Sequence, residues 1–163
     1  MKNNIEILPA LKVAYVRETG KYEEKMANAF KMIYEWYNSI DEFAYIPPRI
    51  IGQYWYCEDN SPVSGEKMAD ACVVIPENFT LTKNENIKIQ TISGGKYITK
   101  LFKESASTNN VFEKIWTSAY NDFKSSDVEF RIEEDAPTLE IYYNNPFFSP
   151  YKYWILDIAF AIK

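Results

Sequence analysis

Histidine is absent from the 163 residues of the sequence, and this absence removes a large class of catalytic sites. Nucleophile systems of the Ser-His-Asp and Cys-His types need an imidazole as base, and most zinc sites use one as a ligand. The sequence also lacks the Gly-x-Gly-x-x-Gly, P-loop and His-Glu-x-x-His motifs that bind nucleotides or metals. We therefore predict no cofactor and no metal, and any chemistry must come from carboxylates and tyrosines.

Cysteine is scarce, and the sequence has neither an excess of basic residues nor a long apolar run. The two cysteines, Cys57 and Cys72, lie in strand-like apolar runs, where we expect buried thiols and no disulfide framework. The 18 basic residues are scattered among 23 acidic ones, for a net charge of −5, which argues against a DNA-binding surface. No apolar run reaches the roughly 18 residues that span a bilayer, and the N-terminus has no apolar signal region. These features predict a cytoplasmic protein without membrane or direct nucleic-acid contacts.

What the sequence does contain is enough apolar material for one compact domain, with 47% hydrophobic and 17% aromatic residues. The domain carries a weak internal repeat. Gly20-Lys21-Tyr22 opens an amphipathic stretch that ends near Ile40. A second stretch opens 75 residues later, at Gly95-Lys96-Tyr97, and ends near Phe123. An aromatic run and then an apolar run follow each stretch, which predicts two similar units packed together with a groove at their seam.

Periodicity gives each unit the same order of elements. Alternating and β-branched residues predict strands, whereas apolar residues at three- and four-residue spacing predict helices. The expected strands are 11–18, 50–57, 71–75, one that ends at 94–95, 138–143 and 153–162, and the expected helices are 26–40 and 111–123. Unit one spans 11–76, a polar linker 77–88, and unit two 89–163. Two β-α-β-β units predict a single α+β domain with pseudo-twofold symmetry, an antiparallel sheet and both helices on one face.

Four segments, in this order, carry a resemblance to a known family. They are 13–17 with Gly20 and Tyr22, 58–72, the Gly-Gly-Lys-Tyr of 94–97, and the Leu-Glu-Ile-Tyr of 139–142 with Pro146. The chain resembles the GyrI-like effector-binding domains, which are small-molecule sensors of AraC-type and MerR-type multidrug regulators. This resemblance implies a central cleft that binds bulky, often cationic, aromatic compounds, with Glu140 in contact with the ligand. No helix-turn-helix precedes Leu11, so a role in transcription regulation would require a separate regulatory partner that binds DNA.

Glu140 is also a candidate on physical grounds. In an extended strand, Glu140 and Tyr142 share one face, while Leu139 and Ile141 share the other. A carboxylate among aliphatic residues is costly to bury without a partner, which favours a cleft that receives a cation. Aromatic walls would add about 0.5–2 kcal/mol for each cation-π contact. The alternative is that Glu140 faces solvent from a half-buried sheet.

Aromatic residues at equivalent positions complete the predicted site. Tyr54 and Tyr56 share a face of the corresponding strand in unit one, and Trp55 points the other way. Trp36 and Trp116 lie on the two helices, where ligand contact and core packing are both open. The aromatic-rich segment 147–154 forms either a lid over the cleft or a self-packed loop. The predicted ligand-binding residues are Glu140, Tyr142, Tyr54, Tyr56 and Trp116.

Two classes of function fit these residues. In the first, the domain binds a bulky hydrophobic or cationic aromatic small molecule, as a sensor or as a sequestering protein. The second is implied by the resemblance, since some family members without DNA-binding domains are similar to hydrolases of reactive electrophilic compounds. In this class Glu140 and Tyr142 would be catalytic, and a carboxylate with a raised pKa can act as a general base. The resemblance also implies a weaker third function, inhibition of another protein through an acidic surface. Because no residue pattern demands catalysis, we favour binding.

Overall fold

A single curled sheet and two helices make up the fold. The structure is a computed structural model, and it describes residues 2–20, 24–55, 68–82, 86–131, 137–145 and 152–163. Eight strands pair antiparallel in the order β1-β6-β8-β7-β3-β4-β2-β5. The strands are β1 (Asn4–Leu8), β2 (Leu11–Thr19), β3 (Ile50–Tyr54), β4 (Met68–Val74), β5 (Lys88–Ile92), β6 (Gly95–Ser105), β7 (Thr138–Tyr142) and β8 (Tyr153–Ala161). The helices are α1 (Met26–Asn38), α2 (Val111–Ser125) and the short 3-10 helix η2 (Asp41–Phe43).

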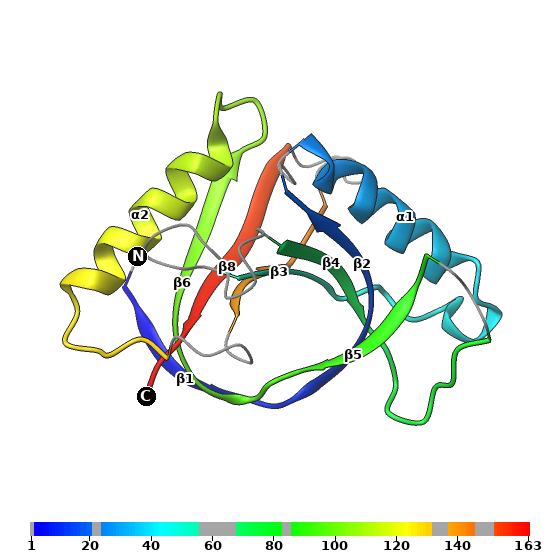
Figure 1. The fold of residues 1–163 in the computed structure, drawn as a ribbon. Coiled ribbons are helices and arrows are strands. Elements are labelled where there is room, and N and C mark those ends of the chain that lie inside the picture. Colours follow the sequence, from blue (N-terminus) through cyan, green and yellow to red (C-terminus); the bar gives the residue numbers. More distant parts are fainter. Residues whose placement is uncertain (1, 21–23, 56–67, 83–85, 132–136, 146–151) are drawn as a thin grey trace.

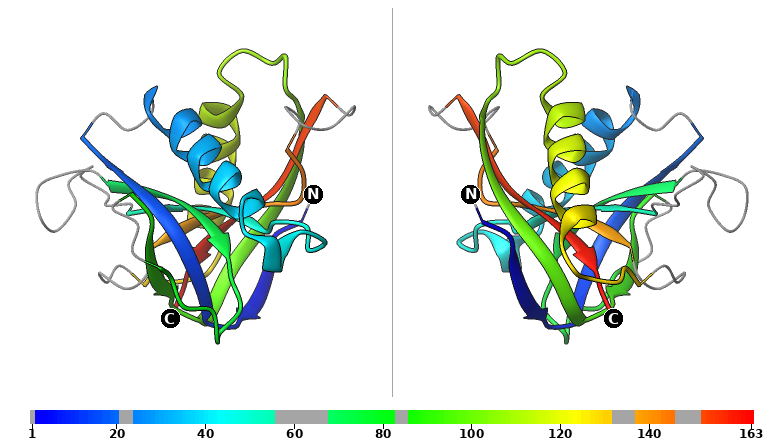
Figure 2. Two further views of the ribbon diagram at one scale, coloured as in Figure 1. Left: turned by 90° about the vertical axis from the view of Figure 1, so that its right-hand side faces the viewer. Right: turned by 90° about the vertical axis from the view of Figure 1, so that its left-hand side faces the viewer.

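The register of the strands explains why both helices lie on one side of the sheet (Figure 1, Figure 2). Directly paired residues on neighbouring strands share a face. Ala71 of β4 pairs with Gly52 of β3, Gly52 pairs with Glu140 of β7, and Glu140 pairs with Ile158 of β8. Ala71 belongs to the apolar core under α1, and Ile158 belongs to the core under α2. These residues therefore lie on one face, which we call the helix face.

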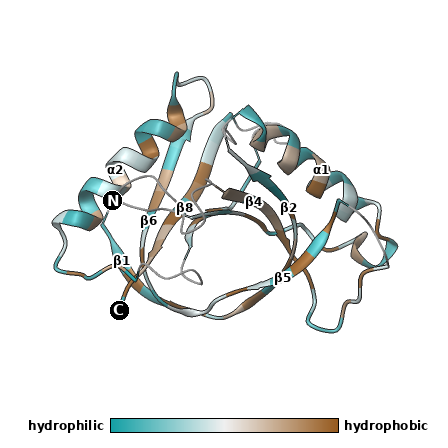
Figure 3. Cartoon of the chain, viewed as in Figure 1, coloured by the Kyte–Doolittle hydropathy of each residue, from teal (hydrophilic) through white to brown (hydrophobic). Residues whose placement is uncertain are grey.

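Two apolar clusters join the helices to the sheet, and a third covers the other face of the sheet. Ala29 and Ile33 of α1 are buried against β2 and β4, and Ile115 and Ala119 of α2 are buried against β6 and β8. Their four-residue spacing gives each helix one apolar side, and hydropathy accordingly varies along both helices (Figure 3). The third cluster, around Tyr97, fills the opposite face of the sheet. Full burial of a side chain such as Ile33 stabilises the fold by about 1.5–3 kcal/mol.

The two halves of the chain exchange their edge strands. β1, at the start of the chain, pairs with β6, and β5 pairs with β2. When β1 to β4 are matched with β5 to β8, the strand order reads the same from both edges, and β3 meets β7 at the centre. The successions β2-α1-β3-β4 and β6-α2-β7-β8, the antiparallel sheet and the shared helix face confirm the predicted fold class.

One alignment within the predicted repeat is wrong. Residues 95–105 do not open an amphipathic helical stretch, because they form β6. Ile98 and Phe102 are buried under α2, and the intervening Thr99 is buried on the opposite face, which is the two-residue period of a strand. Gly20 follows β2 with a φ of 71°, whereas Gly95 begins β6 with a φ of 135°, so the two glycines occupy different places in their units.

The first strand was not predicted. β1 is only five residues long, and it lies at an edge of the sheet with Ile5 and Ile7 exposed by 61% and 74%. A short edge strand buries little of its own sequence pattern, so periodicity does not reveal it.

Candidate functional site

Glu140 lies on the helix face at the centre of the sheet, with only 1% of its surface exposed. It is flanked by Gly52 of β3 and Ile158 of β8, so it sits where the two halves of the chain meet. The solvent-facing alternative for Glu140 is therefore wrong. Leu139 and Ile141 belong to the cluster on the opposite face, as the alternation of the strand predicts.

Three side chains hold the Glu140 carboxylate. The indole Nε1 of Trp116 on α2 donates to Oε2 at 2.9 Å. The Tyr142 hydroxyl donates to Oε1 at 2.9 Å, and Tyr54 on β3 is a third hydrogen-bonding partner. The carboxylate is thus fixed by donors from α2, β7 and β3, all of which are neutral groups.

Burial controls the charge of this carboxylate. Loss of solvent raises the pKa of Glu140, and the hydrogen bonds from Tyr54, Trp116 and Tyr142 oppose that rise. Burial and the neighbouring Glu140 charge raise the pKa of Tyr142 well above its ordinary value, so its hydroxyl stays a donor. Among the described residues, no lysine or arginine forms an ion pair with Glu140. The site therefore holds a buried acidic group without a cation.

Aromatic rings from both helices surround the carboxylate. Phe30 of α1 meets the ring of Tyr142 edge-on, with centroids 5.6 Å apart, and Phe112 of α2 lies 6.5 Å from the same ring. Trp154 of β8 lies 5.7 Å from Tyr142, and Tyr54 lies 5.4 Å from Trp116. All six rings are partly exposed, in contrast to Glu140 beneath them. We call this set the aromatic cluster: Phe30, Tyr54, Phe112, Trp116, Tyr142 and Trp154.

Gly52 provides the space that the carboxylate occupies. A Cβ atom at Gly52 would lie 2.8 Å from Oε1 of Glu140 and 2.8 Å from Cε2 of Tyr54. Real Cβ atoms essentially never approach other atoms so closely, so a side chain here must displace one of these two groups.

We therefore expect Gly52→Ala to shift Glu140 or Tyr54 and to cost about 1–3 kcal/mol of folding free energy through overpacking. The indole N–H resonance of Trp116, measured by NMR, should move because its acceptor moves. Gly20→Asn is the matched control, since Gly20 has nothing within 4 Å and asparagine tolerates its φ of 71°. An unchanged Trp116 resonance in Gly52→Ala would contradict the tight fit.

The structure places the other predicted residues as follows. Trp36 packs against Phe43 and Phe79 in the core under α1, so it belongs to the core and not to the aromatic cluster. Trp55 points away from Glu140, toward Arg17, as predicted from alternation. Tyr56 and Cys57 lie outside the described residues, and so do residues 147–151 of the aromatic segment 147–154 that was predicted as a lid or loop.

Sequence reasoning missed the contributions of Phe30, Phe112, Trp154 and Gly52. Phe30 and Phe112 follow the helical spacing of core residues, so their position at the seam gave no separate signal. Trp154 lies on β8, within the predicted strand 153–162, and it contacts the core under α2, but the sequence suggested it only for a lid or a self-packed loop and not for the site itself.

Comparison with known proteins gives the family. The GyrI-like small molecule binding domain matches residues 1–163, which is the entire chain. This chain belongs to that family. A relative of the GyrI-like chain, a DNA gyrase inhibitor from Citrobacter koseri, is 28% identical over 153 residues, which cover 93% of this chain and 91% of the relative.

Solved structures share the GyrI-like fold at low sequence identity. The structure of SAV2435 bound to tetraphenylphosphonium has a TM-score of 0.64 at 14% identity, and the match covers 100% of this chain and 94% of that one. The C-terminal domain of EcmrR has a TM-score of 0.63 at 13% identity, covering 99% and 97%. At such low identities, the TM-scores show a common fold and nothing further.

The described residues contain neither a metal-binding cluster nor a membrane-spanning helix. Within the described ranges, no group of three or more histidine, cysteine, aspartate or glutamate side chains is arranged to hold a metal ion. None of the helices in that part of the chain has the length and apolar character needed to cross a membrane.

Proposed function

We propose that this protein binds a bulky hydrophobic or cationic aromatic molecule against the aromatic cluster, as a sensor or as a sequestering module. The observation that carries the proposal is the buried Glu140 carboxylate beneath partly exposed rings. The hydrogen-bonding partners of this carboxylate are all neutral, so a ligand cation brought next to it adds an electrostatic attraction that these partners do not supply. The ring faces add cation-π attraction and apolar contact area.

The hydrogen bonds around Glu140 favour a ligand that does not need to donate a hydrogen bond of its own to the carboxylate. Both carboxylate oxygens already accept bonds, from Trp116 and Tyr142, and Tyr54 is a further partner. A delocalised or shielded cation gains from the negative charge without competing for these bonds. A protein of the same fold is bound to tetraphenylphosphonium, a cation of this class, which supports the proposal.

The same contacts argue against the hydrolase alternative. A general base must accept a proton from a water molecule at hydrogen-bonding distance. In this site, Oε2 and Oε1 each already accept one bond, from Trp116 and Tyr142 at 2.9 Å, Tyr54 is a third partner, and the residue is only 1% exposed, which leaves a water molecule little access to the remaining acceptor positions. We therefore infer a binding role for Glu140. Turnover is checked by incubating an electrophilic ester for hours with catalytic amounts of protein and measuring its hydrolysis.

The test compares two ligands of similar shape that differ in charge. Tetraphenylphosphonium is a cation, whereas triphenylphosphine oxide is neutral, and both present several phenyl rings. We expect calorimetry to give the tighter Kd for the cation, and binding to quench the emission of Trp116 and Trp154. Trp36→Phe should retain the quenching, because Trp36 lies in the core under α1. Equal affinity for the two compounds would refute a charge-selective site.

A further inference from the structure

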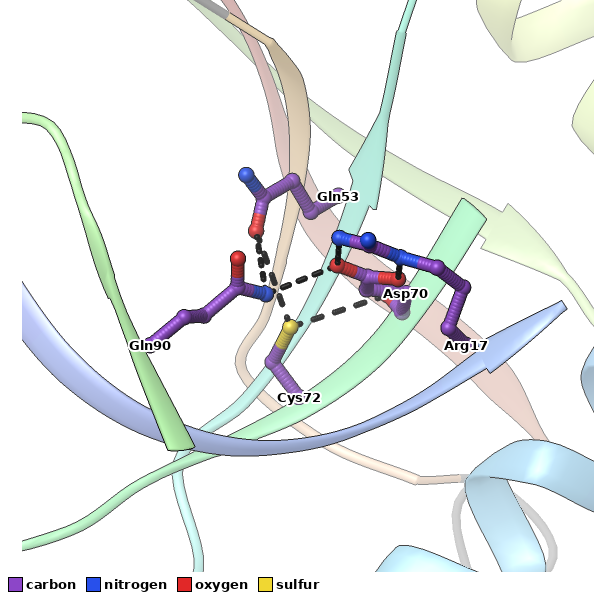
Figure 4. Close-up of polar contacts among 5 residues, drawn as sticks. All are labelled: Arg17, Gln53, Asp70, Cys72 and Gln90. Carbon is purple, nitrogen blue, oxygen red and sulfur yellow. Dashed lines mark hydrogen bonds and ion pairs between the residues drawn. The ribbon is translucent and has the colours of Figure 1, made fainter. Parts of the chain in front are cut away.

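A second polar group lies on the opposite face of the sheet, behind the proposed site. Nε and Nη2 of Arg17 donate to both oxygens of Asp70, at 2.8 and 2.9 Å. Nε2 of Gln90 lies 2.7 Å from Oδ2 of Asp70 and 3.2 Å from Oε1 of Gln53. The thiol of Cys72 faces the same Gln53 oxygen (Figure 4). We call these five residues the Asp70 network.

The Asp70 network fixes four strands to one another. Its members come from β2, β3, β4 and β5, and Asp70, Gln53 and Cys72 are all less than 5% exposed. A buried carboxylate is tolerated only when its partners keep their geometry, so any slip between these strands would leave a charge unsatisfied. Burial also raises the pKa of the Cys72 thiol well above its ordinary value, which keeps it a neutral donor.

Strand β3 links the Asp70 network to Glu140. Gln53 points into the network, whereas its two neighbours, Gly52 and Tyr54, point to the helix face. Gly52 pairs directly with Glu140, and Tyr54 is a hydrogen-bonding partner of the carboxylate. The position of β3 therefore sets both the space for the carboxylate and the reach of the tyrosine that binds it.

Among the described residues of the other half, the matching position has no equivalent network. Asp157 on β8 occupies the position that matches Asp70 on β4, and it pairs with Ile141 and Leu101. Neither neighbour carries a polar side chain. The hydroxyl of Tyr143 contacts Asp157 instead, and Tyr143 is 60% exposed. The half that supplies Tyr54 is thus the half in which a buried carboxylate, Asp70, is paired with an arginine, Arg17, that is partly exposed.

We propose that Asp70 and Gln53 are positioning residues for the Glu140 site, because they hold β3 where Tyr54 reaches the carboxylate. Their effect on ligand affinity rests on the proposed function. Their effect on the geometry around Glu140 exists without any ligand.

The test uses Asp70→Asn, which keeps the shape and removes the charge that binds Arg17. In ligand-free protein, we expect the Trp116 indole N–H resonance to shift, because the carboxylate that accepts it is repositioned. Affinity for tetraphenylphosphonium should fall about tenfold, within the range found for residues that act through a neighbour. A Trp116 resonance and an affinity that both match the parent would overturn the proposal.

Controls separate positioning from general loosening. Asp157→Asn makes the same change at the matching position of the other half, and should leave the Trp116 resonance unchanged. Ile92→Ala removes buried apolar contacts on the same face of the sheet and leaves the hydrogen bonds and the charge of the Asp70 network in place. A Trp116 shift of equal size in Ile92→Ala would count against positioning. If Asp70→Asn does not fold, Gln53→Leu removes the link to β3 alone and is judged by the same two outcomes.

A double-mutant cycle tests the route through Tyr54. If Asp70 acts through Tyr54, then in a Tyr54→Phe background Asp70→Asn should change the Trp116 resonance little further. Additive shifts would show that Asp70 acts by another route and would overturn the proposal. Should the parent protein bind no tetraphenylphosphonium, the proposed function fails, while the resonance and the cycle still decide whether Asp70 positions the site.

Discussion

Glu140→Gln is expected to weaken tetraphenylphosphonium binding by about 1–3 kcal/mol, roughly 5- to 150-fold in Kd. The substitution keeps the side-chain shape and removes the buried negative charge, while stacking against the aromatic cluster remains. Binding of neutral triphenylphosphine oxide should change little for the same reason. Calorimetric titration of both ligands measures the two effects. If the cation binds the parent and Glu140→Gln equally well, Glu140 has no electrostatic role.

Glu140→Gln, which should weaken cation binding, should instead increase the free energy of unfolding at neutral pH. Burial raises the pKa of Glu140 in the folded state, so the folded protein binds a proton more tightly than the unfolded chain does. Stability from this group is present at a pH below the unfolded pKa of about 4.3, and it is lost as pH rises through the higher folded pKa. Above that range, Glu140→Gln should be more stable than the parent. Urea unfolding at several pH values gives the difference, with exposed Glu129→Gln as control.

Phe123→Ala should reduce the free energy of unfolding by about 3–5 kcal/mol, which is more than the loss expected for Gly52→Ala. Phe123 is fully buried, and its ring meets Phe160 edge-on at 5.2 Å in the core under α2. Truncation empties the main contact of the last turn of α2. Because α2 carries Trp116 and Phe112, ligand binding should weaken together with stability.

Urea denaturation followed by circular dichroism measures that loss. The matched control is Tyr45→Ala, since Tyr45 is 99% exposed and should change stability by less than about 0.5 kcal/mol. Equal unfolding midpoints for Phe123→Ala and the parent would mean that α2 is not held by this core.

Much of the central strand could be predicted from the sequence, because alternation alone sorts its side chains. Glu140 and Tyr142 lie on one face and Leu139 on the other, as a two-residue period requires. Helical spacing was less informative. Trp36 and Trp116 lie on similar helices, yet Trp36 packs in a core and Trp116 binds Glu140, because only the relation of each helix to the seam separates them.

Other features could not be predicted from the sequence, because they depend on which strands become neighbours in the fold. Gly52 carries no side chain, so its importance appears only when Glu140 and Tyr54 are seen to occupy the space above it. The Asp70 network joins residues up to 73 positions apart in the sequence, and such long-range pairing is set by strand register. The misplaced start of the second repeat arose because Gly95 resembles Gly20 in its local sequence while it opens a strand and Gly20 ends one.

The pairing of Gly52 with Glu140 leaves a single acidic group at the centre of the duplicated fold. These two residues occupy matching places on β3 and β7, where the two halves of the strand order mirror each other. A glutamate on both strands would put two negative charges in one buried spot, and one of them would have to stay protonated. With glycine on one side, the fold offers a single charge at its centre. Under the proposed function, we therefore expect the two repeats to form one shared site that binds one monovalent cation per chain.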